Sequence, residues 1–472
     1  MRKRNLLSIS LLIAIFMVLP AANIFAMNQF NASSLAMGGA QAPTARGVEV
    51  IGWNPAFLGF SDGPKMSMYT PLTQFANFGF VLANDFLSLD QVDKYFTDGQ
   101  VWTEEDKQSI LNEINGDEWD IYTDFYIPVF AFSFPTQYVN VAFSFDTGVS
   151  SSLSFSKEFI DLALYGNGID NLGSTRDFSD TDIGFQATSR FGMTFAKRFE
   201  HIVDIPYVDE ITTGFTFTYN IGHAYGEVTE SSGSFYTDVG EMVGSGVFEV
   251  VNAGVTGITG HSDDELNEDI EVDAMAGSGV GLDFGIGAKI LKDKGIVGFS
   301  VINLINTMNW TGGQKRLYTF DFDQAPPLEG LDKIDEWVDN NLAMTDTLLS
   351  NEEDFTTELP TIIHLTGGYK PIDKLMVTAA IKTQINDTPG MKKYTRIGFG
   401  ARYEALSMLP VRAGFSMGGR GGFSYGMGLG LHFGFWHTDI GWAYERGFMS
   451  SANGIKMAFT TTWFFGGKAK AL

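Results

Sequence analysis

The feature that most constrains the fold is a strict alternation of apolar and small or polar residues. From Gly279 to Ile290 every even position is apolar, while the odd positions are Gly, Asp or Lys. From Gly422 to Phe435 the odd positions are Phe, Tyr, Met or Leu, and the even positions are Gly, Ser or His. Ile211 to Ile221 and Val141 to Val149 repeat the pattern. A period of two excludes a helix and predicts β-strands with one apolar face.

Composition decides between two ways of burying such a face. In a soluble sandwich the other face would carry more charge than these Gly, Ser and Thr rows supply. Aromatic residues make up 14% of the chain and Gly contributes 54 of 472 residues. After residue 26 the chain has no apolar run of the roughly 18 residues that a membrane helix needs. The sequence therefore predicts an all-β, transmembrane antiparallel β-barrel over residues 65–472.

The number of strands follows from closure, because a bacterial single-chain barrel needs an even number. The alternating segments predict 14 strands. Sixteen is the alternative, since residues 65–86 are long enough for a hairpin and residues 241–260 could contain another strand. With both termini in the periplasm, all periplasmic connections are short, and the long outer loops are 87–119, 150–181, 225–278 and 311–358.

The N-terminus predicts export. Arg2, Lys3 and Arg4 precede an apolar stretch from Leu6 to Leu19, which is the pattern of a signal peptide over residues 1–26. We therefore expect an integral protein of the outer membrane of a Gram-negative-type bacterium. Since the chain has no Cys, disulfides, thiolate metal sites and a lipoprotein anchor are excluded.

Charge is concentrated in the four long loops, which contain 38 acidic and 7 basic residues. A net charge of -25 makes nucleic acid an improbable partner. The run of carboxylates in residues 263–273 lacks the glycine-hinged spacing of a calcium loop, and the six His residues show no paired ligand spacing. We expect no metal and no cofactor.

Two of these loops are predicted to contain small helices. Thr103 to Asp106 begins a capping pattern, followed by Ile110, Leu111 and Ile114 on one helix face. A second apolar stripe is a candidate lining for a ligand groove and consists of Leu331, Ile334, Trp337, Val338 and Leu342. Such stripes should cover either the barrel mouth or a hydrophobic ligand.

Residues 27–64 lack the barrel alternation and are rich in Gly, Ala and Asn. The inward strand rows are mostly Gly, Ser and Thr, and so leave space that a plug would fill. We expect residues 27–64 to form a hatch inside the lumen.

Motifs in this segment resemble a known family. LAMGGA at Leu35 to Ala40 and WNPAFL at Trp53 to Leu58 resemble the N-terminal hatch of FadL-type and PorV-type outer-membrane barrels. Later segments, among them GLDFGIGAKI and ELPTIIHLTGGYKP, are similar to strands of the PorV-like branch. The resemblance implies a movable hatch containing Gly38, Gly39, Trp53, Asn54, Pro55 and Ala56. It also implies docking of hydrophobic substrate by loops 225–278 and 311–358.

One strand contains a residue that interrupts pairing. Pro128 lies within FYIPVFAFSFP and would remove a ladder hydrogen bond from the wall. It is a candidate wall gap and lateral exit, although a proline near a strand end is an equally good interpretation.

No catalytic constellation accompanies these features. Gly422, Ser424 and Gly426 match G-x-S-x-G, but on a strand rather than at a strand-to-helix turn, so we expect no enzyme. The function expected first is passage of hydrophobic, fatty-acid-like compounds through a hatch-gated barrel. The alternative is a PorV-like secretion or surface-attachment barrel that docks exported proteins. A diffusion porin is disfavoured by the plug and by inward rows without paired charges.

The expected partners follow from these two functions. They are membrane lipid, a hydrophobic small molecule or an exported protein, and the outer-membrane insertion machinery. The C-terminus departs from the usual insertion signal, because the aromatic residues Trp463, Phe464 and Phe465 are followed by GGKAKAL.

Overall fold

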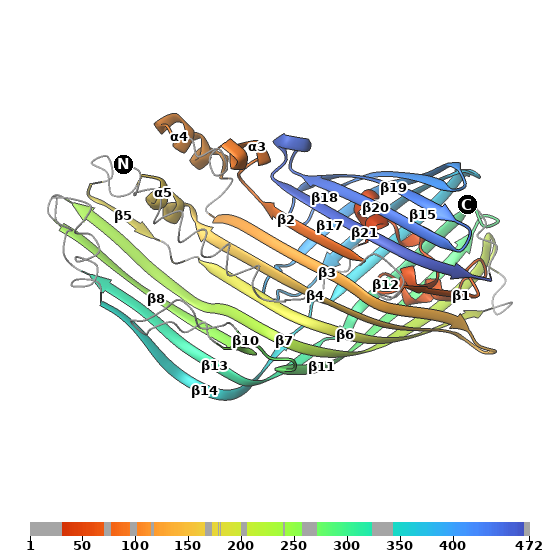
Figure 1. Ribbon diagram of the computed structural model, residues 1–472, viewed down its shortest axis with the longest axis horizontal. Coiled ribbons are helices and arrows are strands. Elements are labelled where there is room, and N and C mark those ends of the chain that lie inside the picture. Colours follow the sequence, from red (N-terminus) through yellow and green to blue (C-terminus); the bar gives the residue numbers. More distant parts are fainter. Residues whose placement is uncertain are drawn as a thin grey trace.

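The computed structural model describes residues 31–69, 77–94, 102–114, 118–165, 172–177, 179, 181–199, 205–238, 241–256, 271–322, 343–466 of the chain. The predicted signal peptide lies outside these residues. The described chain forms a long, tilted barrel of strands with short helices at one end and a helical segment inside it (Figure 1). We call the end that carries α3, α4 and α5 the loop end, and the opposite end the turn end.

The wall is one closed sheet in which every pairing is antiparallel. Its circuit passes through fourteen strands: β1 (Met66–Tyr69), β3 (Glu118–Pro135), β4 (Asn140–Ser156), β6 (Asp182–Phe199), β7 (Val208–Asp238), β11 (Gly277–Ile290), β12 (Gly295–Ile305), β15 (Ile362–Ile372), β16 (Leu375–Gln384), β17 (Tyr394–Leu406), β18 (Leu409–Gly418), β19 (Phe423–Phe433), β20 (Trp436–Glu445) and β21 (Gly454–Phe465). Pairing of β1 with β21 closes the circuit. The predicted fold class, an all-β antiparallel barrel, is confirmed.

Other strands extend this circuit along the barrel axis. β2 (Phe78–Asn84) lies, like β1, between β21 and β3, so β1 and β2 form one interrupted line of strand and not the hairpin considered as the alternative for residues 65–86. Toward the loop end, β7 pairs with β8 (Glu241–Ala253), which pairs with β13 (Thr307–Phe322), which pairs with β14 (Ala343–Glu358). Two short strands, β9 (Val255–Thr256) and β10 (Glu271–Val272), form a separate hairpin, and β5 (Ser174–Asp177) pairs with β7.

These extensions correct the expected loops. Much of 225–278 and 311–358 was expected to be loop, but the sheet continues through residues 225–238, 241–253, 311–322 and 343–358. The strand suspected within 241–260 is β8. Short connections follow β3, β11 and β15, which end at Pro135, Ile290 and Ile372.

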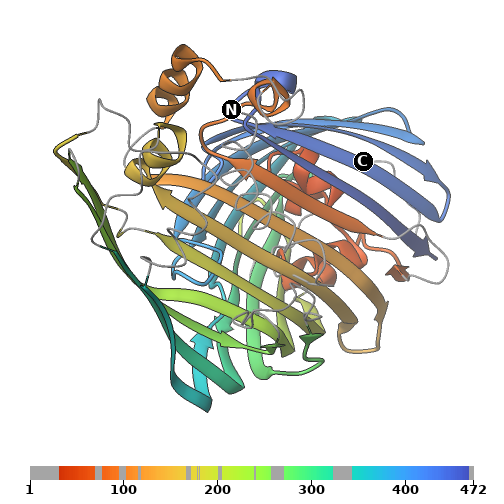
Figure 2. The same cartoon turned by 60° about the vertical axis from the view of Figure 1, so that its left-hand side comes forward.

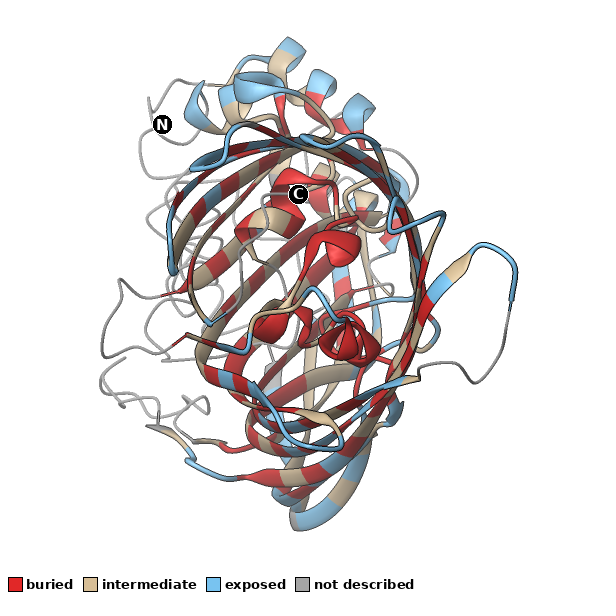
Figure 3. Ribbon diagram, turned by 90° about the vertical axis from the view of Figure 1, so that its right-hand side faces the viewer, coloured by how far each residue is buried: buried red, intermediate tan, exposed pale blue. Residues whose placement is uncertain are grey.

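The alternation read from the sequence separates the two faces of the wall. In β11 the odd positions are buried toward the lumen, whereas Val280 and Ile286 are 57% and 41% exposed on the outward face. The same outward exposure of apolar side chains recurs in Phe217, Leu365 and Leu429. Figure 3 shows buried and exposed residues alternating along the strands. The barrel therefore presents an apolar belt outward, as a membrane-facing surface requires.

Helices cover one side of the loop end. They are α3 (Leu89–Val92), α4 (Glu104–Glu113) and α5 (Lys157–Tyr165), with a 3-10 turn, η7, at Met449–Ser451. α4 begins at the predicted cap, where the Thr103 side chain accepts a hydrogen bond from the Asp106 backbone. Its apolar stripe, Ile110, Leu111 and Ile114, packs with aromatic residues of the rim such as Trp119 and Phe155. Among the described helices, none is long and apolar enough to cross a membrane.

The N-terminal segment, residues 31–62, lies within the barrel (Figure 2). It consists of α2 (Ala32–Ala36) and three 3-10 helices, η1 (Ala42–Thr44), η2 (Gly47–Val50) and η3 (Pro55–Gly59). A buried apolar cluster joins it to the wall, and this cluster includes Val48, Trp53, Phe57, Phe60, Tyr69, Ala131, Ile296 and Met376. Because the segment is nearly all buried, it forms the core of the barrel in this region.

Candidate functional site

The candidate site is the interior of the barrel, which the N-terminal segment occupies. Small residues let its backbone approach the wall closely. Gly38 and Gly39 follow α2 with φ values of 61° and 85°, a left-handed conformation that favours glycine. A Cβ at Gly38 would collide with the backbone oxygen of Phe415 in β18. The turn at Gly38 and Gly39 therefore needs glycine both for its conformation and for its contact with the wall.

Asn54 connects the segment to two strands. Its side chain is 1% exposed, and its amide donates hydrogen bonds to the backbone oxygens of Ile286 (3.1 Å) and Phe299 (3.2 Å). Its side-chain oxygen accepts a hydrogen bond from the Ala56 backbone (3.0 Å) and so caps η3, in which Pro55 occupies the first position. The Trp53 backbone oxygen accepts a hydrogen bond from Ser300 (2.5 Å). One polar side chain thus both starts a helix and anchors it to the wall.

Inward-facing glycines of the strands make room for this segment. A Cβ at Gly214 would collide with the backbone of Pro55, and one at Gly285 with the Asn54 side chain. Gly426 and Gly441 similarly face the backbone of α2. The glycine rows read from the sequence are therefore filled by the N-terminal segment rather than by side chains of the wall.

The inward rows also carry buried charges, which corrects the expectation of a lumen without paired charges. Arg190 and Asp146 are 3.2 Å apart, with side chains 5% and 4% exposed. Arg412 and Asp439 are 2.6 Å apart and comparably buried. Their partners lie far apart in the sequence and meet only when the strands pair, so alternation alone did not reveal them.

An ion network holds the end of the N-terminal segment at the turn end. Asp62 pairs with Arg46 (2.8 Å) and with Lys289 (3.0 Å), and Lys289 also pairs with Glu210 (3.1 Å). Glu210 accepts hydrogen bonds from the backbone and side chain of Ser61. The guanidinium of Arg46 and the ammonium of Lys289 hold the pKa of the Asp62 carboxyl well below its usual range, against the opposing effect of burial.

Glu49 differs from these paired carboxylates, because no ion pair involves it among the described residues. Its side chain keeps some accessible surface but is surrounded by protein. This burial, assisted by the charge of Asp439, raises the pKa of Glu49 to about 7, while Arg402 and Arg412 act in the opposite direction. Glu49 therefore changes charge near neutral pH.

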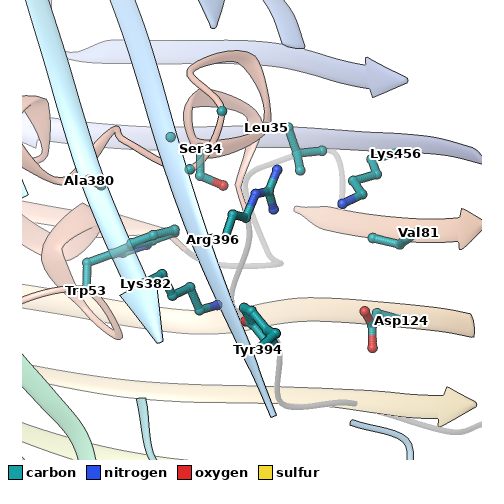
Figure 4. A pocket seen from close by; sticks show the side chains of 13 residues that line it. Ser34, Leu35, Trp53, Val81, Asp124, Ala380, Lys382, Tyr394, Arg396 and Lys456 are labelled. Carbon is teal, nitrogen blue, oxygen red and sulfur yellow. The ribbon is translucent and has the colours of Figure 1, made fainter. Parts of the chain in front are cut away.

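A polar pocket of about 80 Å³ adjoins the N-terminal segment (Figure 4). Ser34, Leu35, Gly38, Gly39 and Trp53 form one side of it. Wall residues complete it, namely Val81, Asp124, Ala380, Lys382, Tyr394, Arg396, Gly398 and Lys456.

The charged side chains that line this pocket differ in whether they form ion pairs. Lys456 pairs with Glu445, and Asp124 accepts a hydrogen bond from Ser150. Arg396 donates to the Ser416 hydroxyl (2.8 Å), and Lys382 lies 5.8 Å from the ring centre of Tyr394. Neither Arg396 nor Lys382 forms an ion pair within the described part of the chain. With Lys456 offset by Glu445, Arg396 and Lys382 face the single carboxylate of Asp124, so the pocket has an excess of one positive charge, which suits an anionic group.

A larger chamber of about 470 Å³ lies toward the loop end. Its apolar side includes Tyr225, Val251 and Phe355, and Tyr225 and Phe355 pack with the buried Trp310. Its other side is formed by residues 387–392 of the connection between β16 and β17. No pattern in residues 385–393 predicted that this short connection folds inward.

The pairing register of β3 is interrupted near Pro128 on one of its two sides. Toward β4, Pro128 is opposite Asp146, with a bulge before Phe130. On the other side, Tyr126 is opposite Gly79 of β2 whereas Ala131 is opposite Tyr69 of β1, so the four residues 127–130 of β3 correspond to the nine residues 70–78. Ala131 and its partner Tyr69 belong to the cluster that packs against the N-terminal segment. The interruption therefore lies beside that segment.

Three further features of the sequence concern the proposed groove, Ser424 and metal ligands. The proposed groove residues Leu331, Ile334, Trp337, Val338 and Leu342 lie outside the described residues. Ser424 is buried within β19, opposite Ser416 of β18, and not at a strand-to-helix turn. The residues that the structure describes include no cluster of three or more potential metal ligands.

Comparison with solved structures gives matches of low identity. The toluene transporter TbuX of Ralstonia pickettii matches with 12% identity and a TM-score of 0.46, covering 93% of this chain and 98% of that one. A TodX mutant, described as a monoaromatic hydrocarbon channel, matches with 10% identity and a TM-score of 0.49 over 92% and 99%. A FadL homologue of Pseudomonas aeruginosa matches with 11% identity and a TM-score of 0.44 over 94% and 100%.

The family assignment comes from the amino-acid sequence and not from the solved structures. Curated proteins provide no match. The resemblance to the PorV-like branch is not confirmed by the matches described above. A family model described as a family of unknown function, DUF5723, matches residues 64–439. The match spans most of the chain, and this protein therefore belongs to the DUF5723 family.

Proposed function

We propose that this protein is an outer-membrane channel for hydrophobic small molecules, in which the N-terminal segment is a hatch. The observation that carries the proposal is the position of that segment: it fills the lumen beside β3, a wall strand whose pairing register is interrupted near Pro128. A molecule that reached the interruption could leave through the wall and enter the membrane without crossing an aqueous phase. The apolar outward belt supports the membrane location.

The pocket charges favour cargo with an anionic head, such as a fatty acid. A cavity of about 80 Å³ is too small for a long acyl chain, since ligand pockets for drug-sized molecules span about 300–1,000 Å³. It is large enough for a carboxylate between Lys382 and Arg396. The acyl chain would require movement of the neighbouring residues of the N-terminal segment, so the described conformation corresponds to a closed channel.

A binding experiment tests the choice of cargo. Purified protein would be titrated with a fluorescent long-chain fatty acid and with the matching alcohol. We expect the acid to bind more tightly, and Lys382→Gln with Arg396→Gln to remove this preference while leaving alcohol binding unchanged. Lys393→Gln, at the nearby chain surface, is the matched control. Equal affinity of the unmodified protein for acid and alcohol would refute the head-group assignment.

A transport experiment tests the route. Pro128→Val supplies the missing N–H and favours continuous pairing, so we expect slower uptake of fatty acid into vesicles that contain the protein. Pro135→Val makes the same replacement at the end of the same strand and should leave uptake unchanged. Unchanged uptake in the Pro128 variant would exclude this interruption as the exit.

A further inference from the structure

The connection between β16 and β17, residues 385–393, folds into the barrel. A pair of backbone hydrogen bonds joins Thr388 and Met391, and Met391 is 1% exposed. The beginning of this connection is bonded to the part of the barrel wall from which it starts. The Asn386 side chain accepts a hydrogen bond from the Thr361 backbone (2.7 Å) and donates one to the Leu359 oxygen (3.0 Å). We call residues 385–393 the strap.

The tip of the strap contacts strands from a distant part of the wall. A Cβ at Gly184 in β6 would lie 2.7 Å from the backbone nitrogen of Gly390, and one at Gly390 would lie 2.9 Å from the carbonyl carbon of Ser150 in β4. In the circuit, four strands separate β6 from β16 in one direction, and six separate β17 from β4 in the other. The strap therefore crosses the lumen.

Charged side chains hold the part of the strap that lies away from its beginning. The Lys392 ammonium is 3.2 Å from the Glu118 carboxylate and 3.4 Å from that of Asp182. Arg420 donates a hydrogen bond to the Gly390 oxygen (2.7 Å). The Lys392, Glu118 and Asp182 side chains are between 43% and 49% exposed, so water screens these pairs and each contributes little stability. Contacts of this kind can break and re-form readily.

The strap borders the larger cavity, and the residue that follows it borders the smaller one. Residues 387–392 form a side of the 470 Å³ chamber at the loop end, whereas the 80 Å³ pocket includes Tyr394, the residue that directly follows the strap. We propose that the strap is a second closure of the channel, which separates the chamber from the pocket and opens when Lys392 leaves Glu118 and Asp182. This inference goes beyond the proposed function, because it concerns access to the pocket and not the identity of the cargo.

Cysteine accessibility tests the strap without any cargo. The chain has no Cys, so Ala380→Cys places a single thiol in the pocket, at a residue that is 7% exposed. The folded protein in detergent would be reacted with N-ethylmaleimide and the labelled fraction followed by mass spectrometry. Tyr138→Cys, at a turn residue that is 76% exposed, supplies the rate for an open site.

We expect slow labelling of Cys at position 380 and an increase of about tenfold when Lys392→Glu is added, since this change removes two ion pairs and adds repulsion. Lys393→Glu is the matched control, because Lys393 pairs with Asp387 within the strap (3.0 Å) and not with the opposite wall. It should leave the rate unchanged. Combining Lys392→Glu with Glu118→Lys should restore slow labelling.

Two results would overturn the proposal. One is a rate at position 380 that already equals the rate at position 138, which would mean that the pocket is open. The other is an equal rate with and without Lys392→Glu. If Lys392→Glu prevents folding, Lys392→Gln removes the two attractions without adding repulsion and must still accelerate labelling. Neither result depends on fatty-acid binding, so failure of the strap and failure of the proposed cargo can be distinguished.

Discussion

Asn54→Ala should detach η3 from the wall while the barrel stays folded. The substitution removes the cap of η3, which costs about 1 kcal/mol, and two hydrogen bonds to strand carbonyls, each worth about 0.5–1.5 kcal/mol. The combined loss is therefore about 2–4 kcal/mol. The strands keep their own pairing, because Asn54 contacts their backbone from inside the lumen.

Hydrogen exchange measures this local loss. Since about 1.4 kcal/mol corresponds to a factor of ten, we expect amides of residues 53–60 to exchange on the order of 100-fold faster in the variant. Amides of β11 and β12 should exchange at their original rates. The comparison requires peptide-resolved exchange followed by mass spectrometry.

Asn31→Ala is the matched control for this experiment. Asn31 also caps a helix, accepting a hydrogen bond from the Ser34 backbone (2.8 Å), but its side chain has no described hydrogen bond to the wall. It should accelerate exchange only within α2. If Asn54→Ala leaves exchange in residues 53–60 unchanged, the anchoring role assigned to Asn54 is wrong.

Three further outcomes are expected. Because the pKa of Glu49 is raised from 4.5 to about 7, its contribution to stability is lost as pH rises through that interval, and Glu49→Gln should abolish this part of the pH dependence of thermal unfolding. Gly214→Ala should destabilise the docked N-terminal segment by about 1–3 kcal/mol through overpacking, seen as faster exchange there, whereas Gly367→Ala, which meets no atom closer than 4.0 Å, should not. Arg190→Met should cost about 3–5 kcal/mol in denaturant unfolding because it leaves Asp146 buried and unpaired, and adding Asp146→Ala should recover much of the loss.

The sequence predicted the strands well where one face of the strand meets the apolar interior of the membrane. The alternation predicted a strand from Gly279 to Ile290, and β11 spans Gly277–Ile290, because its alternation continues to both ends. β7 was expected to end at residue 224 but continues to Asp238. Beyond Gly226 its residues are mostly polar on both faces, since neither face needs to be apolar there. Periodicity therefore could not reveal the extended part of the sheet.

The interior was harder to predict than the wall. Gly38, Gly39 and residues 53–56 were identified through motifs, and the structure places Gly38 and residues 54–56 against glycines of the wall. The charged pairs were missed because Asp146 and Arg190, like Arg412 and Asp439, are adjacent only across paired strands. The strap was missed because a nine-residue connection has no pattern of its own, and only its contacts with distant strands turn it inward.

The N-terminal segment also constrains the order in which the chain can assemble. α2 packs against β19, β20 and β21, and the Ala32 backbone donates a hydrogen bond to Thr460 (3.1 Å), more than 400 residues later. The first strand, β1, pairs with the last, β21, to close the ring. Once that seam is joined, a folded segment with its backbone wedged against strand glycines would have to pass along the barrel axis to reach its place. We therefore expect the segment to pack on the growing sheet before the seam forms, and closure of β21 over a binding surface to which both ends of the chain contribute to be the slowest step of folding.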